Sequence, residues 1–144
     1  MIPQRLSLVT LGVSDLAKSR QFYEAWGWKV HARSGEDIIF YQLNGMVLGL
    51  YPLGELAKDM TVSKDSLGTG MVTLALNFGS EAEVGAAYGT ALLAGASALK
   101  PPQKVFWGGY SGYVRDLDGH PWELAYNPFW KLEDDGNLTL PPRC

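Results

Sequence analysis

Few side chains in this sequence can coordinate a metal ion or act as nucleophiles. The 144 residues include two histidines, His31 and His120, and one cysteine, Cys144. Neither histidine has a second histidine or a carboxylate at ligand spacing, such as i, i+4 on a helix. A histidine- or cysteine-rich metal centre and a disulfide within the chain are therefore excluded, whereas a carboxylate-dominated metal site stays open.

Glu123 is a lone carboxylate in an apolar segment that follows the turn signal Asp118-Gly119. In apolar surroundings its charged form needs a cation or hydrogen-bond donors. Such a group acts as a general base or pairs with a cationic ligand. The alternative is a structural carboxylate that is bonded to Arg115 or Asn77.

Other catalytic signatures are absent from the sequence. It holds no Walker loop, no dinucleotide fingerprint and no serine or cysteine nucleophile elbow. The segment from Gly108 to Gly112 is glycine-rich, but it precedes a strand rather than the N-terminus of a helix. We therefore expect no phosphate cradle there.

The composition indicates one globular domain of ordinary size. Apolar residues make up 47% and charged residues 19% of the sequence, and the net charge is −3. The basic residues are scattered, which excludes the basic stripe that a nucleic-acid partner would need. No signal peptide and no apolar run of about 20 residues is present, so we expect a cytoplasmic protein without a membrane partner.

The N-terminal half shows the order β-α-β-β-β. The segment from Leu6 to Val13 alternates as a strand, and Ser14 as the cap with Asp15 behind it predicts a helix that Gly27 ends. Three strand candidates follow, the last two of which are joined by the hairpin dipeptide Asn44-Gly45, over 28–32, 37–43 and 46–51.

The C-terminal half repeats this order after a polar stretch, 61–69, which we interpret as a linker. The Val-Thr-Leu of residues 9–11 recurs at 72–74, inside a strand signal from Met71 to Phe78. Further along come a helix and two strands around the turn Asp118-Gly119, predicted over 80–93, 113–116 and 122–126.

The duplication predicts an α+β fold. Two βαβββ modules, each unable to bury its sheet alone, should form a curved mixed sheet around a cleft with the helices outside. Module one spans about 1–60, module two spans about 70–128, and residues 129–144 form a C-terminal tail.

Two motifs resemble those of a known family. The string from Leu11 to Leu16, which leads into Phe22-Tyr23, is similar to its opening motif; Asp116 to Leu124 is similar to its closing motif, with Leu117 in place of the usual proline. On these residues the chain resembles the vicinal oxygen chelate superfamily, which includes glyoxalase I, extradiol dioxygenases and bleomycin-resistance proteins. The resemblance implies a single glyoxalase-like domain over 1–144 and a homodimer.

The resemblance also implies four metal-ligand positions, two in each module. They fall at Leu8, Gly49, Met71 and Glu123. Leucine and glycine side chains offer no donor atom, a thioether suits soft copper(I), and one carboxylate cannot hold a divalent ion alone. We therefore expect that the metal site of the family is lost and that no cofactor is bound.

The inward faces of the strands predict a small-molecule site. They combine apolar side chains with a few hydroxyls and one amide. The aromatic, glycine-rich run from Phe106 to Tyr110 is typical of a loop that closes over a flat ligand. The expected ligand-binding residues are Leu8, Thr10, Gly49, Met71, Thr73, Asn77, Trp107 and Tyr110.

Three functions are compatible with these residues. The first is a metal-independent protein of the bleomycin-resistance type that binds a small, flat or cationic molecule in an apolar cleft. The second is a lyase, isomerase or dioxygenase-like enzyme that uses Glu123 with or without a divalent metal. The third is a scaffold whose C-terminal Phe129-Trp130 and Leu138 to Leu140 cover another subunit.

Overall fold

The computed structural model describes residues 1–142, and it divides the chain into two compact units, Met1–Gly68 and a second unit that begins at Thr69. The division falls inside the polar stretch 61–69. Each unit builds one mixed sheet with helices, which confirms the predicted α+β class. Within residues 1–142, no helix is long and apolar enough to cross a bilayer. Cys144 lies outside the described residues.

The first unit contains a three-stranded sheet of order β1-β3-β2. β1 runs parallel to β3, and β2 pairs antiparallel with β3 through the predicted Asn44-Gly45 turn, in which Gly45 has a φ of 73°. The elements are β1 (Leu8–Val13), α1 (Leu16–Ala25), β2 (Ile39–Gln42), β3 (Val47–Pro52), α2 (Leu53–Met60) and the short 3-10 helix η1 (Lys64–Ser66).

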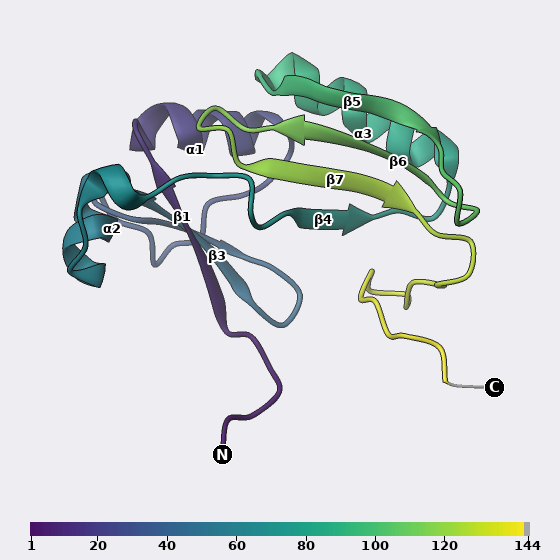
Figure 1. The fold of residues 1–144 in the computed structure, drawn as a ribbon, viewed down its shortest axis with the longest axis horizontal. Coiled ribbons are helices and arrows are strands. Elements are labelled where there is room, and N and C mark those ends of the chain that lie inside the picture. The colour runs from purple at the N-terminus through teal and green to yellow at the C-terminus, as the bar shows by residue number, and fades with distance from the viewer. Residues whose placement is uncertain (143–144) are drawn as a thin grey trace. The chain divides into compact units, whose positions relative to one another are not determined.

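The second unit contains the whole predicted order β-α-β-β-β. Its sheet has the order β4-β7-β6-β5, with β4 parallel to β7 and the other neighbours antiparallel. α3 runs along one face of this sheet (Figure 1). The elements are β4 (Leu74–Asn77), α3 (Glu81–Ala94), β5 (Ser97–Lys104), β6 (Tyr110–Arg115) and β7 (Pro121–Tyr126). The first sheet repeats this order without an equivalent of β5.

The predicted helix ends are confirmed, with one correction. Asp15, and not Ser14, is the N-cap of α1, because its Oδ1 accepts a hydrogen bond from the Lys18 amide at 3.0 Å. That amide belongs to the third residue after Asp15, the usual donor to an N-cap side chain. Ser80 caps α3 in the same way, and Gly95 ends it with a φ of 116°.

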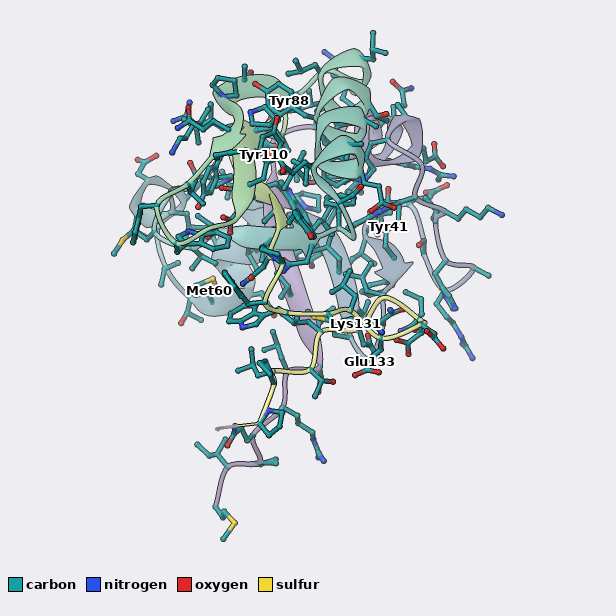
Figure 2. All side chains as sticks on the ribbon, turned by 90° about the vertical axis from the view of Figure 1, so that its right-hand side faces the viewer. Tyr41, Met60, Tyr88, Tyr110, Lys131 and Glu133 are labelled. Atoms are coloured by element: carbon teal, nitrogen blue, oxygen red, sulfur yellow. The ribbon has the colours of Figure 1, made fainter. Side chains whose placement is uncertain are left out.

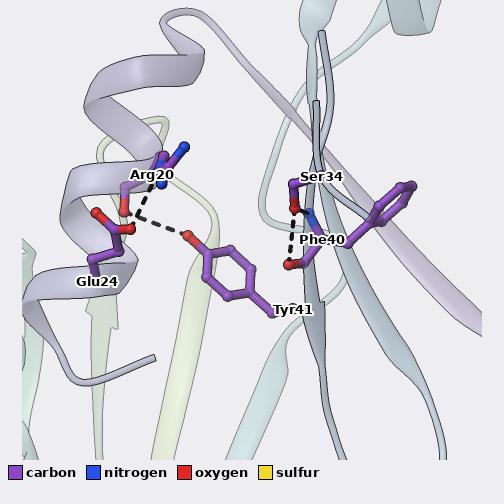
Figure 3. Close-up of polar contacts among 5 residues, drawn as sticks. All are labelled: Arg20, Glu24, Ser34, Phe40 and Tyr41. Atoms are coloured by element: carbon purple, nitrogen blue, oxygen red, sulfur yellow. Dashed lines mark hydrogen bonds and ion pairs between the residues drawn. The ribbon is translucent and has the colours of Figure 1, made fainter. Parts of the chain in front are cut away.

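The strand predicted over 28–32 is wrong, because this segment is loop. The outer edge of β2 is covered at Phe40 by two single contacts instead of a strand. Ser34 Oγ accepts a hydrogen bond from the Phe40 amide at 2.8 Å, and the His31 amide donates to the Phe40 carbonyl at 2.8 Å. Figure 3 shows Ser34 facing the Phe40 backbone. A serine side chain thus replaces one rung of the expected ladder.

Three elements were not predicted, and the shortest of them is η1, which lies in the expected linker. α2 follows β3 directly and packs on the face of the sheet opposite α1, since a Cβ on Gly12 would lie 2.7 Å from Leu53 Cδ1. β5 contains Pro101 and Pro102, which normally indicate a break. They are tolerated because β5 is an edge strand and its pairing with β6 is irregular between Lys100 and Gln103.

The core of the first unit is aromatic. Phe22 and Tyr23 of α1 are buried and meet edge to face with ring centroids 4.8 Å apart. Tyr23 also stacks on Trp28 at 5.7 Å and lies 5.9 Å from Tyr41 of β2. Aromatic pairs of this kind anchor a helix to a sheet. They fix α1 on the face of the sheet that carries Tyr41.

Tyr41 makes the stability of this unit sensitive to alkali. Its hydroxyl donates to the Arg20 carbonyl at 3.4 Å, beside Glu24 (Figure 3). Burial, and then the negative charge of Glu24, raise the pKa of Tyr41 from its ordinary value of 10.0 to about 12, although Arg20 opposes the shift. The stabilisation is therefore complete below pH 10 and is lost as the pH rises through about 12.

We expect Tyr41→Phe to flatten this alkaline loss. Because phenylalanine has no ionisable proton, the free energy of unfolding of the variant should fall less between pH 9 and pH 11 than that of the wild type. Urea denaturation at both pH values, followed by circular dichroism, measures the difference. Equal losses in the two proteins would contradict the role of Tyr41.

Candidate functional site

Glu123 lies in a row of side chains that crosses the second sheet. Ala75 on β4, Glu123 on β7, Tyr113 on β6 and Lys100 on β5 are consecutive register partners. Directly opposed residues project from the same face of a sheet. We name this side, which is opposite α3, the Glu123 face. It brings one carboxylate, one phenol and one ammonium group into line.

The other face of the second sheet packs on α3. Trp122, Leu124 and Val114, which alternate with the Glu123 row, are almost fully buried. Tyr110 shares the parity of Val114 on β6, so it projects from the α3 side and not from the Glu123 face. Figure 2 labels Tyr110 together with Tyr88 of α3, the helix that packs on β6. Tyr110 and Glu123 are thus not brought together.

Tyr113 is the partner of Glu123. The two residues are directly opposed on β6 and β7, so their side chains project from the same face. Burial, and then the negative charge of the nearby Glu123 carboxylate, raise the pKa of Tyr113 from its ordinary value of 10.0. The phenol therefore keeps its proton at neutral pH beside the carboxylate. Neither Arg115 nor Asn77, the two partners expected from the sequence, is the register partner of Glu123.

The length of the preceding turn explains this pairing. The β6–β7 loop is closed by a hydrogen bond from the Asp116 amide to the His120 carbonyl at 3.0 Å, so three residues and not two form the turn. The Asp116 carboxylate accepts from the amides of Asp118 and His120 at 3.0 and 2.9 Å, and Gly119 adopts a φ of 90°. The extra residue places Tyr113 opposite Glu123.

A pocket of about 530 Å³ borders this pair. It belongs wholly to the second unit, and it combines two cations, three hydroxyl-bearing side chains and apolar surface. Pockets of this size and make-up suit small organic molecules. The lining residues are Thr69, Gly70, Thr73, Leu99, Lys100, Tyr113, Arg115, Gly119 and Pro121.

The first unit has a separate pocket of about 330 Å³. Leu8, which was predicted to bind ligand, lines it beside Phe40. Thr10 and Gly49 are register partners on the same face as Leu8, and Gly49 is also opposed to Phe40. The remaining lining residues are Ser7, His31, Arg33, Gln42 and Val47.

The other predicted ligand-binding residues are scattered. Met71 does not belong to β4, which begins at Leu74, and its side chain is fully exposed, with a relative accessibility of 101%. Asn77 is opposed to Ala125 and shares the Glu123 face. The ring of Trp107 folds back over Gly109 inside the tight β5–β6 turn. Of the residues predicted in module two, Thr73 alone lines its pocket.

Comparison with protein families shows where this fold belongs. The model of the Glyoxalase/Bleomycin resistance protein/Dioxygenase superfamily matches residues 5–124. The chain belongs to this superfamily. Among curated proteins, no sequence matches that of this glyoxalase-superfamily chain.

Several solved structures resemble the chain over most of its length. A glyoxalase-related enzyme from Fulvimarina pelagi is 38% identical with a TM-score of 0.88, and the match covers 96% of this chain and 99% of that chain. The hypothetical protein SA1046 from S. aureus is 25% identical with a TM-score of 0.74, covering 88% and 96%. Lactoylglutathione lyase from Agrobacterium tumefaciens, at 18% identity and a TM-score of 0.67 over 92% and 100%, shares the fold.

The metal-ligand positions of the superfamily do not fit a divalent ion in this chain. Leu8 and Gly49 bring no donor atom to their strands, and Met71 lies outside β4. Glu123 supplies the only carboxylate among the four positions. In the described part of the chain, residues 1–142, no group of three or more His, Cys, Asp or Glu side chains could hold a metal ion. These residues lack the donors that zinc or manganese needs.

Proposed function

We propose that this glyoxalase-superfamily protein binds a small organic molecule on the Glu123 face without a divalent metal. One observation carries the proposal. Of the four metal-ligand positions, only Glu123 carries a carboxylate, and it is opposed to Tyr113, which lines a pocket of about 530 Å³. One carboxylate without further donors cannot hold a divalent ion. The cytoplasmic location and the homodimer stay predictions.

The Glu123 face suits a flat molecule. Ala75 and Thr73 are small, and Pro121 presents a rigid apolar surface on the neighbouring strand β7. A planar ligand gains most from such a surface, because it makes contact over one whole side. A cationic ligand would be attracted by Glu123, but Lys100 and Arg115 border the same pocket and repel it.

A second candidate function is acid–base catalysis, which the opposed positions of Tyr113 and Glu123 favour. Glu123 is the candidate general base for a bound carbon acid, and the Tyr113 hydroxyl is a hydrogen-bond donor on the same face. Lyases and isomerases use a base of this kind. A dioxygenase-like reaction would need a metal ion, for which the four ligand positions lack donors.

The test is a search for small molecules that co-purify with the wild-type protein, followed by their binding to variants. We expect an extracted molecule to raise the melting temperature of the wild type. Tyr113→Phe and Glu123→Gln should each change its affinity, by up to about tenfold for one hydrogen bond or one charge near the ligand. Tyr88→Phe on α3 is the matched control and should bind as the wild type does.

The same variants separate the two functions. If the extracted molecule is converted to a product, Glu123→Gln should abolish turnover while circular dichroism shows a folded protein, which supports catalysis. If it is bound unchanged, the binding function holds. Equal affinity in Glu123→Gln, Tyr113→Phe and the wild type would remove the Glu123 face from both functions.

A further inference from the structure

Two cations in the second unit form no ion pair with the acidic groups of residues 1–142. Lys100 is the register partner of Tyr113, and Arg115 lies two residues further along β6 on the same face. Both line the 530 Å³ pocket, whose other lining residues are uncharged. Among residues 1–142, neither side chain takes part in a hydrogen bond or an ion pair. The pocket therefore carries two positive charges in a protein whose net charge is −3.

Glu123 does not neutralise these cations. It lies on β7, with Tyr113 between it and Lys100 in the register row, and it does not line the pocket. Arg115 is opposed to Pro121, which carries no charge. Both cations are thus available to a negatively charged group in the pocket.

We propose that this pocket binds the oxyanion group, carboxylate or phosphate, of a small organic molecule. The proposal rests on the function proposed for the Glu123 face and names the class of its ligand. The guanidinium fork of Arg115 matches two oxyanion oxygens, and Lys100 adds a point charge. The hydroxyls of Thr69 and Thr73 supply neutral donors at the same pocket.

The charges also orient the ligand. An oxyanion is attracted to Lys100 and Arg115 and repelled by Glu123, so the charged group occupies the β5–β6 side of the pocket. The uncharged remainder then lies toward β7, against Pro121 and near the Tyr113–Glu123 pair. This orientation brings the neutral carbon skeleton, and not the oxyanion, to the candidate base.

The experiment is an amide NMR titration of the full chain at low salt with benzoate, phenyl phosphate and benzamide, a neutral analogue of benzoate. We expect at least one of the two anions to shift the amides of Lys100, Tyr113 and Arg115 and to bind about tenfold tighter than benzamide. A preference for benzoate indicates a carboxylate ligand, and a preference for phenyl phosphate indicates a phosphate ligand. Added salt should weaken the binding of the preferred anion, because it screens the attraction to the two cations.

Variants assign the binding to the two cations. Arg115→Met and Lys100→Met should each reduce anion affinity about tenfold while the affinity for benzamide stays unchanged. Lys104→Met is the matched control, because Lys104 lies on β5 opposite Tyr110 and shares its face. The control should bind the anions as the wild type does. A melting curve of each variant checks that it folds.

Other outcomes overturn the proposal without touching the proposed function. If benzamide binds as tightly as both anions, or if Lys104→Met loses as much affinity as Arg115→Met, the pocket does not recognise an oxyanion. The proposal is also overturned if neither anion shifts these amides at concentrations up to about 10 mM. Specific recognition by two cations should give a dissociation constant below that concentration. The binding function is tested separately. It fails if the extracted molecule has the same affinity for Glu123→Gln and Tyr113→Phe as for the wild type.

Discussion

Replacing Leu124 by alanine is expected to lower the free energy of unfolding by about 3 kcal/mol, within the usual range of a large-to-small change in a core. Leu124 is 1% exposed at the centre of β7, between Leu76 of β4 and Gly112 of β6. It faces α3, from which Val84 and Ala91 are fully buried against the sheet. The shortened side chain leaves a void between the sheet and α3, and the surrounding structure fills it only in part.

Urea denaturation followed by circular dichroism measures the loss at Leu124. Leu93→Ala on α3 is the matched control, because Leu93 is 92% exposed and its removal should change stability by less than about 0.5 kcal/mol. If Leu124→Ala were as stable as Leu93→Ala, α3 would not pack on the face that carries Leu124.

Gly112→Ala is expected to destabilise the second unit by about 2 kcal/mol, although it adds a single methyl group. A Cβ at Gly112 would lie 2.8 Å from the Pro102 nitrogen and 2.9 Å from the Lys100 carbonyl oxygen. Both atoms are backbone and cannot rotate away, so β5 must move. Because Lys100 lines the pocket, the displaced strand should also weaken ligand binding there.

A second glycine gives the opposite sign and serves as the control. Gly89 lies inside α3, and a Cβ at this position meets nothing within 4 Å. Gly89→Ala should raise the free energy of unfolding by up to about 1 kcal/mol, because alanine is the better helix former. We expect the denaturant midpoint of Gly112→Ala to lie below the wild-type value and that of Gly89→Ala to lie above it. If Gly112→Ala had the same stability as the wild type, the backbone of β5 would not lie this close to Gly112.

Much of the fold could be predicted because the signals were local. Capping residues and turn glycines predicted the ends of both helices to within one residue, and Asn44-Gly45 predicted the first hairpin. β5 was missed because Pro101-Pro102 indicates a break unless the strand is known to be at an edge. The strand expected over 28–32 failed for a tertiary reason, since Ser34 occupies the backbone amide that it would have paired with.

The candidate site was predicted in part. The resemblance of the closing motif to that of the superfamily selected Glu123, and the structure surrounds it with a register row that includes Tyr113 and Lys100. Tyr113 escaped prediction because Asp118-Gly119 indicates a two-residue turn, whereas the loop has three residues and shifts the pairing. Lys100 depends on an irregular edge strand, so no sequence pattern pointed to it.

Metal-independent binding of a small organic molecule is the central claim, and metal analysis of the untagged protein, purified together with its bound molecule, tests it most directly. Elemental mass spectrometry should find less than about 0.1 equivalent of any divalent transition metal, because Leu8, Gly49 and Met71 offer no suitable donors. Near-stoichiometric zinc, nickel, manganese or iron that is lost in Glu123→Gln would contradict the claim and restore Glu123 as a metal ligand.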